Sequence, residues 1–201
     1  GAELSVDYSY QLQDVWLVDA SLKGLLPLNQ ARENWRLGNG VQSNQLQIIQ
    51  SELQLDLLRQ FNQIKLGGWL AYQYHQQSRK NFVINGVQKN IGRITETVQT
   101  AWLGAAIEST SDDGAVKMRL EGGLPLWVHT TNSSVKGVFN KRAGFRLGAD
   151  LRLLLPWHLS GQDMSLVAGY QYKQLGDELI PGALWPKNSW QSMSLGMNVQ
   201  W

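Results

Sequence analysis

The chain of 201 residues contains no cysteine, few charged residues and no long apolar run. Without cysteine it can form no disulfide framework and perform no thiolate chemistry. Its apolar runs fall far short of the roughly 18 residues that a membrane-spanning helix needs, so a helical membrane protein is excluded. Charged residues make up 17% of the chain, less than the ~25% typical of soluble domains. The net charge of +2, without basic stretches interleaved with aromatic residues, argues against a nucleic-acid partner.

Apolar and polar residues alternate along much of the sequence. Between residues 142 and 155 every second residue is apolar, from Ala143 through Phe145 and Leu147 to Leu155. Successive side chains of a strand leave opposite faces, so this pattern predicts a long strand with one apolar face. Strands of soluble proteins usually have about five or six residues, whereas crossing a bilayer takes ~9–11. A strand of this length and pattern is typical of a transmembrane β-barrel.

The same alternation recurs along the chain, and we interpret residues 1–201 as a single all-β domain. Eight strands are expected, within residues 4–12, 49–57, 64–75, 93–107, 116–129, 142–155, 164–173 and 192–201. The connections alternate long and short, beginning with the long segment 14–44, part of which (28–37) could form a short helix. An even number of strands puts both termini at the end with the short turns. A ten-stranded alternative adds strands at 15–23 and 33–40.

Alternation does not determine the apolar face of one expected strand or the pairing of another at its proline. The strand within 93–107 has two candidate apolar faces. One consists of Ala101, Leu103, Ala105 and Ile107, and the other of Val98, Trp102 and Ala106. Pro125 has no amide hydrogen to donate to a neighbouring strand, so we expect a bulge or a missing ladder bond there.

The strand pattern and the closing run of residues 193–201 resemble those of bacterial outer-membrane eight-stranded β-barrels. The run looks like the assembly signal of that family, in which apolar residues alternate and an aromatic residue ends the chain; here these are Leu195, Met197, Val199 and Trp201. Phenylalanine is the usual last residue, so Trp201 departs from the pattern. The resemblance implies a transmembrane antiparallel up-and-down β-barrel in a Gram-negative outer membrane, with long extracellular loops, short periplasmic turns and both termini periplasmic. It also implies insertion by the barrel-assembly machinery.

A soluble barrel of the lipocalin type would also alternate, with its apolar side chains inside. Three features favour the membrane arrangement. The polar faces are rich in Gly, Ser, Gln and Asn, whereas a solvated face usually carries more Lys and Glu. The connection lengths alternate strictly. Aromatic residues gather at strand ends, as interfacial girdles do, and these are Tyr8, Tyr10, Tyr72, Tyr74, Tyr170, Tyr172 and Trp201.

If the polar faces point inward, charges of both signs gather in the lumen. The expected set is Asp7, Glu52, Asp56, Lys65, Lys117, Arg119, Glu121, Arg142, Arg146, Asp150, Arg152 and Lys173. Eight strands enclose a space that side chains nearly fill, and charges held there must pair. The sequence therefore predicts a salt-bridged interior. The alternative is a narrow gated channel for small solutes, in which an arginine–carboxylate pair re-pairs.

Two histidines are the only candidates for catalysis, and both are weak. We expect His75 and His129 on inward faces at the loop-side ends of their strands. The outer-membrane resemblance raises the alternative of a lipid A-modifying enzyme, since such enzymes use a His–Ser pair near the rim. Those deacylases place serine two residues after histidine, and this chain has Thr131 there. No cofactor and no metal site are expected, because the histidines lack a nearby carboxylate or third ligand.

Basic residues without neighbouring carboxylates mark two of the long loops. We predict that they contact lipopolysaccharide phosphates, and they are Arg79, Lys80, Lys89, Lys136 and Lys141. The apolar loop 14–44 could cap the barrel, lie on the membrane or bind a protein partner. The function expected from the sequence is thus structural or recognition-based, with outer-membrane lipids, lipopolysaccharide or a protein at the surface loops as partners.

Overall fold

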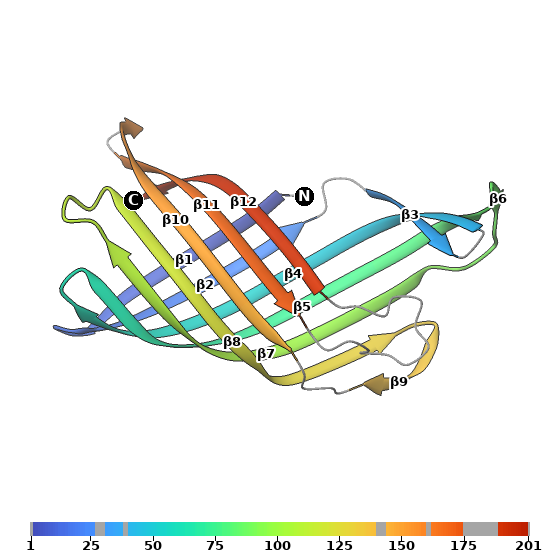
Figure 1. Cartoon of the computed structure of the whole chain (residues 1–201), viewed down its shortest axis with the longest axis horizontal. Helices are drawn as coiled ribbons and strands as arrows, with labels where there is room; N and C mark the ends of the chain where they lie inside the picture. Colours follow the sequence, from blue (N-terminus) through green and yellow to red (C-terminus); the bar gives the residue numbers. More distant parts are fainter. Residues whose placement is uncertain are drawn as a thin grey trace.

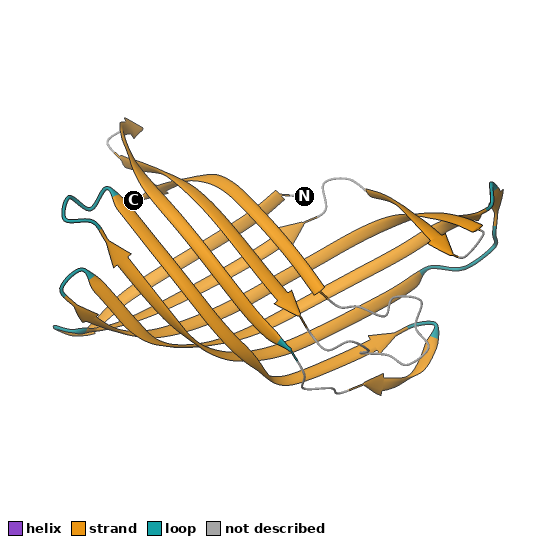
Figure 2. Ribbon diagram, in the orientation of Figure 1, coloured by secondary structure: helices purple, strands orange, loops and turns teal. Residues whose placement is uncertain are grey.

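The computed structural model describes residues 2–26, 31–37, 40–139, 144–159, 162–174 and 189–200. Every regular element in these ranges is a strand, and the strands form one antiparallel sheet that curls into a half-barrel (Figure 1; Figure 2). Within the same ranges there is no helix long and apolar enough to cross a membrane. The expected all-β antiparallel fold is confirmed.

Nine strands follow one another along the path of the sheet: β1 (Ala2–Gln13), β2 (Trp16–Leu26), β4 (Gly40–Phe61), β5 (Ile64–Ile84), β7 (Ile94–Thr110), β8 (Val116–Asn132), β10 (Phe145–Leu159), β11 (Gln162–Gln174) and β12 (Ser189–Gln200). Three short strands, β3 (Ala31–Leu37), β6 (Val87–Gln88) and β9 (Val135–Phe139), pair with β4, β5 and β8 respectively. With 22 and 21 residues, β4 and β5 are the longest strands, and they project beyond their neighbours together with β3 and β6 (Figure 1).

The eight strands expected from alternation are all present, and the segment 14–44 adds to them. It contains β2 and β3, near the two extra strands of the ten-stranded alternative, and residues 31–37 are a strand where a short helix was considered. Pairing with β1 on one side and β4 on the other holds β2 in the sheet. Its outward positions include Ala20 and Gly24, so its apolar alternation is weaker in sequence than that of β4.

Short connections gather at one end of the sheet and longer ones at the other; we name these the turn end and the loop end. Residues 14–15, 62–63 and 111–115 connect strands at the turn end, where β10 also ends and β11 begins. In the 111–115 turn, the Ser111 hydroxyl donates to Asp113 Oδ1 at 2.6 Å and lowers the pKa of Asp113. Because β2 makes the path odd-numbered, β1 begins at the loop end and β12 finishes at the turn end (Figure 1). The expectation that both termini share one end is therefore wrong for the described strands.

The two faces of the sheet differ sharply in chemistry. On β4 the outward residues Leu53, Leu55 and Leu57 are 46–47% exposed. The inward residues that alternate with them, Glu52 and Asp56 among them, are at most 5% exposed. The apolar face thus lies outside the curl and the polar face inside it, as the alternation predicts.

Strand β7 shows which of its two candidate faces is the outer one. Leu103 and Ile107 are exposed, whereas Val98, Trp102 and Ala106 are buried on the inner face. These three pack with Leu58, Trp69, Ala71 and Val128 in a small apolar cluster. The inner face is therefore not uniformly polar, and its apolar part is centred on β7.

A bulge at Pro125 reverses the facing of the last part of β8. Ala101 pairs with Trp127 and Trp102 with Pro125, so one residue of β8 is extra at this point, as expected for a proline within a sheet. Beyond the bulge Val128 and Thr130 are fully buried on the inner face. His129 consequently faces outward, where its ring stacks on Trp127 with centroids 5.6 Å apart. The inward placement predicted for His129 is wrong, because simple alternation does not survive the extra residue.

Trp102 and Leu103 are adjacent in β7 but lie on opposite faces of the sheet, so substitutions at these two positions test the facing of the strand. Trp102→Ala should lower the free energy of unfolding in detergent micelles by about 3–5 kcal/mol, because it empties a fully enclosed site. Leu103→Ala, on the exposed outer face, should have a much smaller effect. Denaturant titration followed by far-UV circular dichroism measures both, and a larger loss for Leu103→Ala would contradict the facing.

Candidate functional site: an ion-pair network inside the sheet

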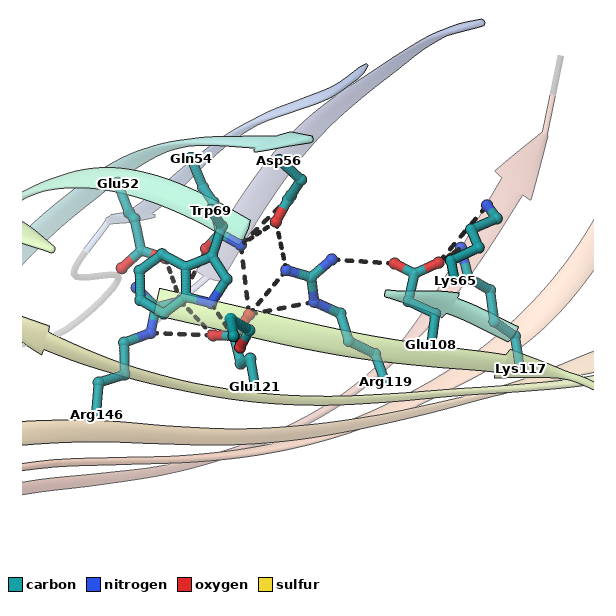
Figure 3. A network of polar contacts seen from close by, with 11 residues as sticks. Glu52, Gln54, Asp56, Lys65, Trp69, Glu108, Lys117, Arg119, Glu121 and Arg146 are labelled. Carbon is teal, nitrogen blue, oxygen red and sulfur yellow. Dashed lines mark hydrogen bonds and ion pairs between the residues drawn. The ribbon is translucent and has the colours of Figure 1, made fainter. Parts of the chain in front are cut away.

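The inner face holds a connected network of charged side chains drawn from five strands (Figure 3). Its members are Glu52, Gln54 and Asp56 from β4, Lys65 and Trp69 from β5, Glu108 from β7, Lys117, Arg119 and Glu121 from β8, and Arg146 from β10. Each charged side chain reaches the interior because it occupies an inward position of its strand. The network contains four carboxylates and four cations, so its charge is balanced, as burial requires.

Arg146 is the most enclosed member of the network, with 1% of its surface exposed. Its Nη2 donates to Glu121 Oε1 at 2.7 Å, to Glu52 Oε1 at 2.9 Å and to Gln54 Oε1 at 2.9 Å. Its Nε donates to Glu121 Oε1 at 3.0 Å. Charge-assisted bonds of this kind are the strongest that side chains make.

Arg119 forms a second centre of the network. Its Nη2 donates to Asp56 Oδ1 at 2.6 Å and to Glu121 Oε2 at 3.0 Å, and its Nη1 donates to Glu108 Oε1 at 3.0 Å. Glu108 Oε2 in turn lies 3.1 Å from Lys117 Nζ and 3.6 Å from Lys65 Nζ. Glu121 touches both arginines and therefore joins the two centres.

These ion pairs connect strands that are far apart in the sheet. Along the path, β5, β7 and β8 lie between β4 and β10, yet Arg146 of β10 bonds to Glu52 of β4. Likewise Arg119 of β8 bonds to Asp56 of β4 across two intervening strands. In a flat sheet these partners would be well over 10 Å apart, since adjacent strands are about 4.8 Å apart. The network therefore holds the sheet in its curled form.

Two glycines make room for the ring beneath Arg146. The guanidinium carbon of Arg146 lies 4.7 Å from the Trp69 ring centroid, a cation–π contact, and Trp69 Nε1 donates to the Ala105 carbonyl at 3.1 Å. A Cβ at Gly123 would come within 2.6 Å of the Trp69 ring, and one at Gly104 would overlap the same ring. Trp69 thus lies flat on the backbone of β7 and β8, where Arg146 can cover it.

The structure brings together most of the predicted lumen set, namely Glu52, Asp56, Lys65, Lys117, Arg119, Glu121 and Arg146. Asp150 is paired in register with Arg119, and Arg152 with Lys117. Asp7 faces the same way but is exposed on β1. Arg142 and the Lys173 side chain lie outside the described part of the chain.

Sequence reasoning missed Glu108 and Lys23 as interior residues, and it did not predict the contact between Trp69 and Arg146. Glu108 was missed because the strand was expected to stop at residue 107, whereas β7 continues to Thr110. Lys23 lies on β2, which was expected to be a loop; it is paired in register with Glu52. The alternation of β5 does place Trp69 inward. Gly104 of β7 and Gly123 of β8 were the only sequence features that could have indicated where its ring packs.

A smaller polar cluster lies at the loop end. Arg79 is buried; its Nε donates to Glu33 Oε2 at 2.8 Å and its Nη2 to Gln77 Oε1 at 2.8 Å. Asn44 donates to the same Glu33 oxygen at 2.7 Å. Arg79 therefore ties β5 to β3, and its predicted contact with lipopolysaccharide is not supported, because the guanidinium is enclosed.

Two other predicted contact residues, Lys80 and Lys89, lie at the loop end. Lys80 is half-buried and Lys89 is exposed. Lys136 lies in β9, and its side chain, like all of Lys141 and Trp201, is outside what the structure describes. In the assembly run, Leu195 is exposed on β12 beside Met197 and Val199.

The two histidines do not form one site. His75 is buried on the inner face between the amide groups of Gln50 and Gln77, whereas His129 lies on the outer face. Among the described residues, no group of three or more His, Cys, Asp or Glu side chains is arranged to hold a metal ion. No protein-family model matches the chain, and no curated protein matches it.

Removing the central cation should unbalance the network. Arg146→Ala leaves Glu52 and Glu121 buried without it, and we expect a loss of about 3–5 kcal/mol in the free energy of unfolding. Arg146→Met combined with Glu52→Gln should recover part of that loss. Arg59→Ala, which removes an exposed arginine of the outer face, is the control. Equal effects of Arg146→Ala and Arg59→Ala on denaturant midpoints would show that the network contributes nothing.

Two glycine variants test whether Trp69 packs directly against the backbone of β7 and β8. Gly104→Ala should destabilise the fold clearly, because its methyl group would overlap Trp69 and the Gly122 carbonyl. Gly122→Ala should be nearly neutral, because its methyl group would meet Leu147 at an ordinary 3.6 Å. Thermal unfolding in micelles compares the melting temperatures of the two variants. Similar melting temperatures would be inconsistent with this packing of Trp69.

Proposed function

We propose that this protein is a small integral outer-membrane β-barrel protein with a structural or recognition role. Its ion-paired interior makes the barrel rigid, and its loop end contacts lipopolysaccharide or a protein partner. The observation that supports this proposal most strongly is the distribution of side chains, with apolar residues on the outer face of the sheet and charged residues on the inner face. A water-soluble barrel keeps its leucines inside, whereas here the leucines at outward positions, such as Leu55 and Leu120, are exposed and Arg146 is enclosed.

The outer face offers an apolar surface of the right height for a bilayer. On β5 it runs from Ile64 through Leu66 and Leu70 to Tyr74, ten residue steps or roughly 33 Å of strand. Strands tilted by ~40° would convert this length into the ~25 Å apolar band of outer-membrane barrels. A contiguous apolar surface of this extent is unfavourable in water, and hydrocarbon would cover it.

Aromatic side chains lie at both margins of this surface. At the turn end, the guanidinium of Arg59 lies 4.9 Å from the Phe61 ring centroid and 5.9 Å from that of Trp16. Toward the loop end, the Tyr72 hydroxyl donates to Gln99 and the Tyr74 hydroxyl donates to Gln76. Rings with one apolar side and one polar partner suit the boundary between hydrocarbon and headgroups.

The loop end supports a recognition role. The projecting parts of β4 and β5, with β3 and β6, extend past the apolar surface (Figure 1). Exposed Lys89 and half-buried Lys80 lie there and could bind lipopolysaccharide phosphates as point charges. We propose the same contact for Lys136 and Lys141, and insertion by the barrel-assembly machinery for the whole chain.

A matched pair of arginine substitutions tests the membrane proposal. Leu120 and Val87 are similarly exposed, at 51% and 57%, but Leu120 lies within the apolar surface and Val87 in β6 beyond it. Leu120→Arg should prevent insertion into phospholipid vesicles, since a cation at the bilayer midplane costs about 2–4 kcal/mol. Val87→Arg should insert normally, as measured by co-flotation with vesicles. Equal insertion of both variants would argue against a lipid-facing Leu120.

A narrow channel is the second candidate, because the ion pairs that cross the interior could exchange partners. Arg146 lies over the Trp69 ring, with 4.7 Å between the guanidinium carbon and the ring centroid. Because this contact obstructs the interior between β5 and β10, we expect the unmodified protein to show no steady conductance in planar bilayers. Arg146→Ala should raise conductance by removing the largest enclosed charged group. Steady conductance of the unmodified protein, altered in selectivity by Arg146→Ala, would make the channel the better proposal.

A lipid A-modifying enzyme is a third candidate, favoured by the outward position of His129 beside Trp127. Thr131 follows on the same face, where a hydrolytic pair would carry serine. We expect mass spectra of lipid A to be identical in cells with unmodified protein, with His129→Ala and without the protein. Loss of a modified lipid A species on His129→Ala would establish the enzyme instead.

A further inference from the structure

Strands β1 and β12 form the two edges of the curled sheet. Among the described strands, β1 pairs with β2 and β12 pairs with β11, and neither has a second strand partner. The outward residues of these edges are unusually exposed. Leu4 and Val6 are 66% and 69% exposed, and Met193 and Leu195 are 87% and 76% exposed. Outward leucines in the centre of the sheet, such as Leu55 at 46%, are shielded by strands on both sides.

The directions of the two edge strands determine how they can be joined. Neighbours along the path are antiparallel throughout, and the path has an odd number of strands. Both edge strands therefore run from the loop end to the turn end. If they met directly, the seam would be parallel, whereas closed barrels of this kind are otherwise antiparallel with even strand numbers.

We infer that the free edges of β1 and β12 bind an amphipathic β-strand that does not belong to the twelve described strands. This strand runs from the turn end to the loop end, antiparallel to both edges, and completes an even-numbered cylinder. The inference depends on strand direction and on edges that have no second partner among the described strands. It also rests on the proposed insertion into a membrane, which gives every copy the same orientation.

The edges also define the chemistry of the strand that they bind. Leu4 and Val6 continue the apolar outer face, so the incoming strand needs apolar residues at its outward positions. On the inner face, Asp7 is exposed and is paired in register with Ser21 on its covered side. An inward lysine or arginine near Asp7 would give it an opposite charge, as the rest of the interior has. A bare edge also leaves backbone donors and acceptors unpaired, which favours strand addition.

A second copy of this chain fits the edges less well. Two copies inserted in the same orientation would bring β1 of one against β12 of the other. Both strands run toward the turn end, so each of the two seams would be parallel. The same reasoning disfavours closure of one copy on itself.

The absence of cysteine allows disulfide trapping in the refolded chain of 201 residues in detergent micelles. Val6→Cys is combined with Met193→Cys or with Leu195→Cys and exposed to a mild oxidant. We expect neither a disulfide within one chain nor a disulfide-linked dimer to accumulate. A disulfide within the chain would show direct closure, and a linked dimer would show pairing of copies; either result would overturn the inference.

A strand-addition assay supplies the positive test. The probe is a synthetic peptide with the sequence Trp16–Leu26 of β2, which runs from the turn end to the loop end and already pairs with β1 on its other side. A fluorophore is attached at Leu4→Cys, near the loop end, and a quencher at either end of the peptide. An extended peptide of this length is about 35 Å long, so the two quencher positions are readily distinguished.

We expect the quencher at the peptide carboxyl end to reduce fluorescence several-fold more than the one at the amino end. A peptide of the same composition without alternation, and a fluorophore at Leu55→Cys in central β4, are the controls and should show no quenching. Stronger quenching from the amino end would indicate parallel addition. That result, or an absence of quenching in a chain shown to be folded by its circular dichroism, would overturn the inference.

Discussion

The enclosed arginine Arg146, held by two carboxylates from other strands, is the interaction on which the rest of the structure depends. A guanidinium with 1% exposure is stable only where carboxylates surround it. Its partners come from β4 and β8, so pairing them requires those strands to curl around the same space. Once the charged faces are turned inward, the alternation of each strand places its leucines outside. The apolar outer surface and the ion-paired interior are thus two results of one constraint.

Backbone details adapt the sheet to this constraint. Gly104 and Gly123 leave space for Trp69 to lie flat, which brings its ring under Arg146. The bulge at Pro125 reverses the facing of β8 above the network, so Val128 and Thr130 extend the inner surface. Below the bulge, Arg119 and Glu121 keep the facing that connects them to β4. The interior therefore holds the ion-pair network toward the turn end and, toward the loop end, Val128, Thr130 and the separate Arg79–Glu33 pair.

Alternation predicted eight of the nine strands on the path of the sheet, their facing below the bulge and the charged residues of the network except Glu108, but not which of them pair. It failed in three places, each for a physical reason. Strand β2 has small outward residues, so neighbouring strands define it more than its own pattern does. The position of His129 depends on one extra residue at Pro125, which alternation cannot include. Arg79 is basic and lies in an expected loop, but its pairing with Glu33 arises only when β3 folds against β4.

Accessibility along β5 tests the central claim most directly. Single nitroxide labels at each position from 64 to 74, in protein reconstituted into vesicles, can be relaxed either by oxygen in hydrocarbon or by a water-soluble nickel chelate. The account predicts a period of two, with oxygen contact greatest at Leu66, Leu70 and Tyr72 and least at Lys65, Trp69 and Gln73. The opposite phase, with the labels at Leu66 and Leu70 shielded and that at Lys65 exposed, would contradict it.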